Sequence, residues 1–323
     1  MQATKRNCGL DVTLKFKLMT YNKLIIIFFN IILISKLSAQ TNTNADYSFY
    51  RDRIAVAPES IFAKFIEAGM SPANHVLTET EQRKVANAFS LLPPLHLKIL
   101  KEHLQSISFM DNMPNTALTS PVEQEAAANK KFNITFRAGI LNETISEWAT
   151  VKEKSLYDTS ARPSLELQID AGNFDAFVYV LLHEATHVVD AVLKLTPHAE
   201  ETDSVINHTA YTRNIWRLYN VPEVRYTKPE LEKTRFRGGK VQPITSAKNI
   251  YDSLKKTPFV SLYGMASWHE DIAELVTIYH LTHTLNQPFV VYIKENGEIQ
   301  SKFEPIKSRL VKRRIKLCAL FYA

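Results

Sequence analysis

Residues 174–195, FDAFVYVLLHEATHVVDAVLKL, form a strongly apolar stretch around the run His183-Glu184-Ala185-Thr186-His187. Apolar residues flank this run on both sides, at 177–182 and 188–189. The stretch is long enough for a helix and follows a short loop at 170–173, so the sequence predicts a buried core helix. Two imidazoles and a carboxylate are costly to bury in such a helix unless they serve as ligands.

The spacing of these polar residues indicates a metal site. Positions i and i+4 of a helix share one face, about 6 Å apart at Cβ, so His183 and His187 can direct two imidazoles at one cation. Imidazole nitrogen is a good zinc donor, and a catalytic zinc typically has three protein ligands with one position open for water. Glu184 stands beside them and can accept a proton from that water as general base. A chance match on a surface helix is the alternative, but the apolar flanks argue against it.

The third ligand must come from another helix. The segment Trp268–Glu274, WHEDIAE, offers Glu270. Glu274 lies on the same face and can hold a hydrogen bond to a ligand imidazole. A solvated acidic helix face is the simpler interpretation of this segment taken alone, and Asp271, Glu274 and His269 stay open as alternative ligands.

The residues that follow His187 exclude one class of HExxH zinc proteins. A metzincin needs Gly and His where Asp190 and Leu193 stand, so that class is excluded. Asp190 falls one turn beyond His187 on the same helix. It either supports a ligand or caps the helix against a neighbour.

The combination HExxHxxD and a later Tyr-Gly-x-x-x-x-x-Glu-x-x-x-Glu, here Tyr263, Gly264, Glu270 and Glu274, resembles the gluzincin metallopeptidases. The closest resemblance is to the catalytic domain of anthrax lethal factor and its relatives, and it covers residues 160–290.

The resemblance implies a zincin-like fold, Zn²⁺ as cofactor and a peptide or protein as substrate. It makes Glu270 the third zinc ligand and Tyr263 the residue that polarises the scissile carbonyl or stabilises the oxyanion. A plain core aromatic is the alternative role for Tyr263. In gluzincins the strand before the active-site helix pairs with an extended substrate. Residues 165–169 alternate apolar and polar side chains and occupy that place, so their free edge is expected to border the cleft.

The expected fold class is α+β, with an active-site helix and a small sheet after a mostly helical N-terminal region. The predicted divisions are a signal peptide at 1–39, a helical region at 40–125, and a zincin-like domain at 126–323 with an insertion around 200–260. Further expected elements are helices at 58–68, 78–92 (capped by Thr78), 94–107, 265–285 and 302–320, a strand at 132–136, and a loop or linker at 112–129. His75, His96 and His103 are expected at the surface or the edge of the core.

The leader indicates export. A basic stretch ends at Lys23, an apolar run spans 24–33, and small residues at Ser38 and Ala39 fit a cut after Ala39. The true start is expected at Met19. An uncleaved anchor is the alternative, although the apolar run is short for a membrane span. The expected location is therefore periplasmic or secreted, with no stable membrane insertion after cleavage.

The charge and the cysteine content argue against a nucleic-acid-binding protein and against a disulfide-stabilised one. Of 39 basic and 33 acidic residues, six Lys or Arg and one Asp lie in residues 1–39, which leaves 33 and 32 beyond the leader. This near-neutral remainder excludes a nucleic-acid partner. Cys8 would leave with the leader, so Cys318 would stand alone and no disulfide framework forms.

Two rival functions stay open beside an exported zinc metallopeptidase. One is a catalytically weak zinc-containing binding or regulatory protein that kept the site. The other is a non-peptidase zinc hydrolase that acts on an amide or ester of the cell envelope. No feature of the sequence indicates an oligomeric state.

Overall fold

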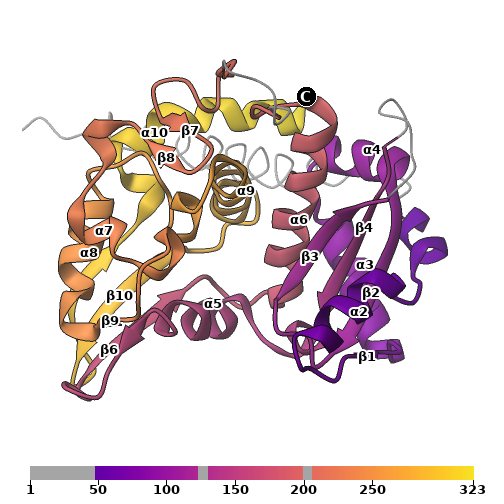
Figure 1. The fold of residues 1–323 in the computed structure, drawn as a ribbon, viewed down its shortest axis with the longest axis horizontal. Coiled ribbons are helices and arrows are strands. Elements are labelled where there is room, and N and C mark those ends of the chain that lie inside the picture. The colour runs from indigo at the N-terminus through magenta and orange to yellow at the C-terminus, as the bar shows by residue number, and fades with distance from the viewer. Residues whose placement is uncertain (1–47, 123–129, 199–205) are drawn as a thin grey trace, which may run out of the picture. The chain divides into compact units, whose positions relative to one another are not determined.

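The computed structural model describes residues 48–122, 130–198 and 206–323 (Figure 1). All of these residues belong to one compact unit, Tyr47–Ala323. The predicted signal segment lies outside the described residues. The unit combines helices with two principal sheets, which confirms the mixed α+β class.

Four strands form the first sheet, in the order β1-β2-β4-β3. Their bounds are Ala73–Asn74 (β1), Leu104–Asp111 (β2), Ala117–Pro121 (β3) and Phe132–Arg137 (β4). β2 runs parallel to β4, whereas β3 is an antiparallel edge strand beside β4. β4 confirms the strand predicted there. β3 contradicts the loop or linker expected around it, because its ladder with β4 orders a segment whose own composition is that of a loop.

The predicted boundary between residues 125 and 126 passes through this sheet. β2 and β3 precede that point, and β4 follows it. Separate strands of one sheet share a single hydrogen-bonded ladder and core, so the two regions belong to one compact unit.

Three helices accompany the first sheet: α2 (Glu59–Glu67), α3 (Glu79–Ser90) and α4 (Pro94–His103). α3 begins with the predicted cap, in which the Thr78 hydroxyl accepts from the Glu81 amide and the Glu81 carboxylate accepts from the Thr78 amide. α4 ends at His103, short of its predicted end, because the following residues pair with β4 as strand β2.

α6 (Ala176–Leu193) is the central helix, with the first sheet on one side and α9 (Trp268–Tyr279) on the other (Figure 1). The Phe177 ring packs against Phe136 and Phe109, with centroids 4.9 and 5.6 Å away. Within the described residues, α6 is the one helix long and apolar enough to cross a membrane, but 78% of it is buried inside the protein. Both helices confirm the predicted core elements, and α9 continues into a π-helical turn, His280–Thr284.

The second sheet has the order β11-β10-β6 and is antiparallel throughout. Its strands are β6 (Leu165–Asp170), β10 (Val290–Glu295) and β11 (Glu298–Phe303). α5 (Ile145–Lys154) packs against β6 and starts with its own capping box, formed by Thr144 and Glu147. β6 confirms the predicted strand. The helix expected from residue 302 is wrong at its start, because Lys302 belongs to β11 and pairs with Tyr292 of β10.

The segment between α6 and α9 consists of short elements. Its helices and strands are β7 (Trp216–Leu218), β8 (Val221–Pro222), α7 (Pro229–Glu232), β9 (Gln242–Pro243) and α8 (Ala247–Leu254). β9 pairs with β5 (Tyr157–Asp158), and α10 (Arg309–Ile315) lies near the C-terminus. Short 3-10 helices span Ser48–Arg53, Ala138–Asn142, Val224–Tyr226, Arg235–Arg237, Ile244–Ser246, Tyr263–Met265, Pro305–Lys307 and Lys316–Tyr322.

Two histidines buried in this core make the fold acid-sensitive. His96, expected at the surface or core edge, is fully buried, and its Nε2 lies 2.9 Å from the Thr186 hydroxyl on α6. Burial, reinforced by His280, lowers the pKa of His96 to about 3, and burial lowers the pKa of His280 to about 4. The unfolded chain protonates both near pH 6.5, so their contribution to stability is full above that pH and falls as the pH drops toward 4.

We expect His96→Gln to flatten this dependence. Each histidine contributes a slope of about 1.4 kcal/mol per pH unit below pH 6.5, and the substitution removes one of the two. Urea unfolding at pH 7, 6 and 5 measures the slope for both proteins. Equal slopes would show that His96 is not held neutral by the fold.

Candidate metal centre

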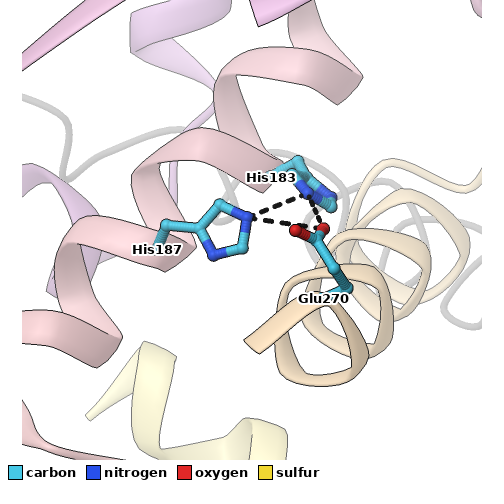
Figure 2. Close-up of side chains that lie close together, drawn as sticks. All are labelled: His183, His187 and Glu270. Carbon is cyan, nitrogen blue, oxygen red and sulfur yellow. Dashed lines mark hydrogen bonds and ion pairs between the residues drawn. The ribbon is translucent and has the colours of Figure 1, made fainter. Parts of the chain in front are cut away.

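Three side chains from two helices converge at the centre of the protein. His183 and His187 project from successive turns of α6, and Glu270 projects toward them from the first turn of α9 (Figure 2). The Nε2 atoms of the two histidines lie 3.1 Å apart. Glu270 Oε2 lies 2.9 Å from His183 Nε2 and 3.5 Å from His187 Nε2.

The donor atoms fit a small metal ion. A tetrahedral zinc with bonds of about 2.0–2.1 Å holds its ligand atoms about 3.3 Å apart. The three observed separations, 2.9, 3.1 and 3.5 Å, bracket that value. Two imidazole nitrogens and a carboxylate oxygen that face one another are stable only when a proton or a cation lies between them, so the predicted triad is positioned to hold a metal ion.

The start of α9 places Glu270. Ser267 is the N-cap, and its hydroxyl accepts a hydrogen bond from the Glu270 amide at 3.3 Å. A carboxylate in the first turn also faces the positive end of the helix dipole. Burial acts to raise the pKa of Glu270, but His187 and His183 outweigh it and hold the pKa well below its usual range. Glu270 is therefore presented to the site as an anion.

Glu274 supports a ligand rather than acting as one. Its Oε1 lies 3.1 Å from His183 Nδ1 and accepts from the Tyr179 hydroxyl at 2.9 Å. Its Oε2 accepts from the Ser261 hydroxyl at 2.6 Å. The hydrogen bond to Nδ1 leaves Nε2 of His183 free to face the metal position, which is the role predicted for Glu274.

Asp271 is ruled out as a ligand by its partners. It is fully buried, and both its oxygens accept from the Arg314 guanidinium at 2.8 Å. The Trp216 indole donates to the same carboxylate at 2.8 Å. This buried ion pair attaches α10 to α9 and leaves no oxygen for a metal.

His269 belongs to a separate cluster with Asp190 and His198. The donor atoms of these three residues all lie within 4.8 Å of one another. Asp190 accepts from the amide and hydroxyl of Thr196 at 2.7 and 2.6 Å, and His269 Nδ1 lies 2.7 Å from it. Asp190 thus holds the chain reversal after α6 and links it to α9, so of its two predicted roles the structure favours the contact with a neighbour.

Glu184 faces a cleft beside the candidate metal centre. Its Oε2 accepts a hydrogen bond from the Thr119 hydroxyl of β3 at 2.6 Å. Two pockets meet there, of about 540 and 520 Å³, and Asn115, Ala117, Glu184 and Tyr263 line both. The sequence did not indicate Thr119 as a site residue, because the composition of its segment predicts a loop.

The strand that borders the cleft is β3, and the expectation for β6 is wrong. β3 pairs with β4 alone among the described strands, so its other edge is open toward the cleft. β6 lines neither pocket. On its outer edge, the Thr150 hydroxyl of α5 accepts from the Ile169 amide at 2.9 Å and donates to the Ile169 carbonyl at 3.3 Å. The covering helix therefore blocks that edge.

Tyr263 lies next to His183 in the cleft. Its ring stacks on His183, with centroids 5.7 Å apart, and it lines both pockets. Burial and the nearby carboxylates, Glu270 foremost, raise the pKa of its hydroxyl far above the ordinary value. The phenol is therefore protonated and able to donate at neutral pH.

Comparison with known proteins identifies no relative of this chain. No family model, no curated protein and no solved structure matches the chain. The interpretation of the site therefore depends on its donor atoms, their separations and the cleft beside them.

We expect Arg314→Met to destabilise the fold by about 3–5 kcal/mol, because it leaves the Asp271 carboxylate buried without its cation. The double variant Arg314→Met/Asp271→Leu should lose less, since it removes both charges. Urea unfolding measures both. An equal loss in the single and double variants would contradict the ion-pair account of Asp271.

Proposed function

We propose that the protein is an exported zinc-dependent peptidase of the gluzincin type. The observation that carries the proposal is the convergence of His183, His187 and Glu270, with Glu184 turned into a cleft beside them. The leader predicted at 1–39 supports export, and periplasmic or secreted placement follows from it.

The arrangement of elements supports a zincin-like fold. An antiparallel edge strand, β3, lies beside the helix that carries both histidines, and the third candidate ligand comes from a later helix, α9. The order of these parts along the chain agrees with the resemblance implied by Glu270, Glu274 and Tyr263.

The donor set suits zinc, since two imidazoles and one carboxylate leave a fourth position open. A bound zinc ion would supply Lewis-acid activation of water and of the scissile carbonyl. In this proposal Glu184 takes the proton of the attacking water and later delivers it to the leaving amine. The hydrogen bond from Thr119 fixes one carboxylate oxygen of Glu184 and leaves the other to face the cleft.

The remaining groups of the cleft fit a peptide in extended form. The open edge of β3 presents backbone donors and acceptors, so a substrate strand can add to the sheet there. The protonated Tyr263 hydroxyl can donate to the oxygen on which negative charge develops during attack. In this proposal the scissile bond would lie between β3 and α9, next to Glu184.

We expect Glu184→Gln to lower kcat on cleavable peptides by about 100- to 10,000-fold, because the general base is lost. Bound zinc should be retained, because Glu184 is not among the donors.

Tyr263→Phe should lower kcat by about 100-fold with a smaller change in KM, as expected for a group that acts in the transition state. A fluorogenic peptide library and zinc analysis of each variant supply the measurements.

The outcomes separate the rival functions. Zinc binding without turnover of any peptide would favour a binding or regulatory protein. Turnover of envelope amides or esters, but not of peptides, would favour a non-peptidase hydrolase. Full peptidase activity in the Glu184→Gln protein would contradict the proposed mechanism.

A further inference from the structure

A half-buried lysine lies in the pocket next to the candidate metal centre. Lys152 belongs to α5 and lines the pocket of about 540 Å³ that also contains His183 and Glu184. We call this space the Lys152 pocket; its other walls include Trp148, Phe236 and Tyr263.

Aromatic rings hold the ammonium group of Lys152. Its Nζ lies 3.7 Å from the centroid of the Tyr263 ring, 5.1 Å from Trp148 and 5.9 Å from Phe236. Such contacts stabilise a cation away from bulk water, but they do not neutralise it. Because Tyr263 also stacks on His183, the ammonium lies one ring away from the metal ligands.

The ammonium of Lys152 has no carboxylate partner within 4.0 Å in the described part of the chain. Glu153 and Glu274, whose pKa values the Lys152 charge acts to lower, have other partners. Glu153 accepts a hydrogen bond from the Tyr251 hydroxyl, and Glu274 accepts from Tyr179 and Ser261. The charge of Lys152 is thus left available to a ligand in the pocket.

The two pockets of the cleft differ in charge. Glu184 is the one carboxylate that lines the Lys152 pocket, and Arg235 adds a second cation at its wall. The other pocket is lined by three carboxylates and three histidines and by no Lys or Arg: Glu184, Asp190, Glu270, His187, His198 and His269. A negatively charged substrate group is therefore favoured on the Lys152 side and disfavoured on the other.

We propose that the Lys152 pocket binds a carboxylate of the peptide substrate close to the scissile bond. This inference rests on the proposed peptidase function and specifies its substrate class. The carboxylate is either the side chain of an acidic residue or the free C-terminus of a short peptide, since both present the same group. Lys152 is a specificity-determining residue in this account, and Arg235 assists at the wall.

Binding of three labelled peptide pools tests the inference without requiring turnover. The protein is the full chain with Glu184→Gln, loaded with zinc. The first pool carries Glu and a C-terminal amide, the second carries Gln and an amide, and the third carries Gln and a free C-terminal carboxylate. We expect the first or the third pool to bind about 10- to 100-fold tighter than the second, as for one charge-assisted contact.

Two substitutions on α5 provide the matched comparison. Lys152→Met in the same background should remove most of the preference for the carboxylate pool, because the cation is lost. Lys154→Met removes a lysine from the same helix that does not line the pocket and pairs with Glu166 at 4.0 Å. It should keep the preference. Lys152→Glu should shift the preference toward a fourth pool, which carries Lys and a C-terminal amide.

The possible results distinguish this inference from the peptidase proposal. Preference for the first pool identifies an acidic side chain, and preference for the third identifies a C-terminal carboxylate. Equal binding of all pools, or a preference that survives Lys152→Met, overturns the inference even if the wild-type protein cleaves peptides. Carboxylate preference without cleavage by the wild-type protein leaves the pocket assignment standing and contradicts the peptidase function.

Discussion

The contact of His183 with Glu270 and Glu274 ties α6 to α9 across the centre of the protein. One imidazole nitrogen faces each carboxylate, at 2.9 and 3.1 Å, and His183 and Glu274 are both buried. Charges buried in this way are stable only when each has a partner, so the two helices must meet in this register. His187, one turn later on α6, then also lies next to Glu270. The same packing of α6 on α9 therefore forms both the core and the candidate site.

The elements around that contact make a cleft with two different sides. β3 contributes an open edge and the Thr119 hydroxyl, whereas α5 contributes Lys152 and blocks the outer edge of β6. On the opposite side, Asp190 of α6 binds Thr196 in the chain after the helix and lies in one cluster with His198 and with His269 of α9. The cleft thus has cationic side chains on one side of the candidate metal centre and histidines with carboxylates on the other.

Local patterns were sufficient to predict the parts of this structure whose signals lie within one element. The His183–His187 spacing, the Thr78 cap and the alternation in β4 and β6 each express a period or a short-range hydrogen bond. The hydrogen bond of Glu274 to a ligand imidazole was also predictable, because Glu270 and Glu274 share a helix face.

Features that depend on contacts between residues distant in the sequence could not be predicted from local patterns. β3 has the composition of a loop and becomes a strand only through β4, and Thr119 therefore gave no signal. Arg314 excludes Asp271 from the metal site through a contact between α9 and α10, elements far apart in sequence. Lys152 and His96 depend equally on which distant side chains enclose them.

Metal content is the most direct test of the central claim that His183, His187 and Glu270 form one metal site. Elemental analysis of the purified protein should find about one zinc per chain, the content of a single three-ligand site. His183→Ala and Glu270→Ala should each lose it or bind it much more weakly, and His269→Ala should retain it. Zinc retained in Glu270→Ala, or no zinc in the unaltered protein after reconstitution, would contradict the account.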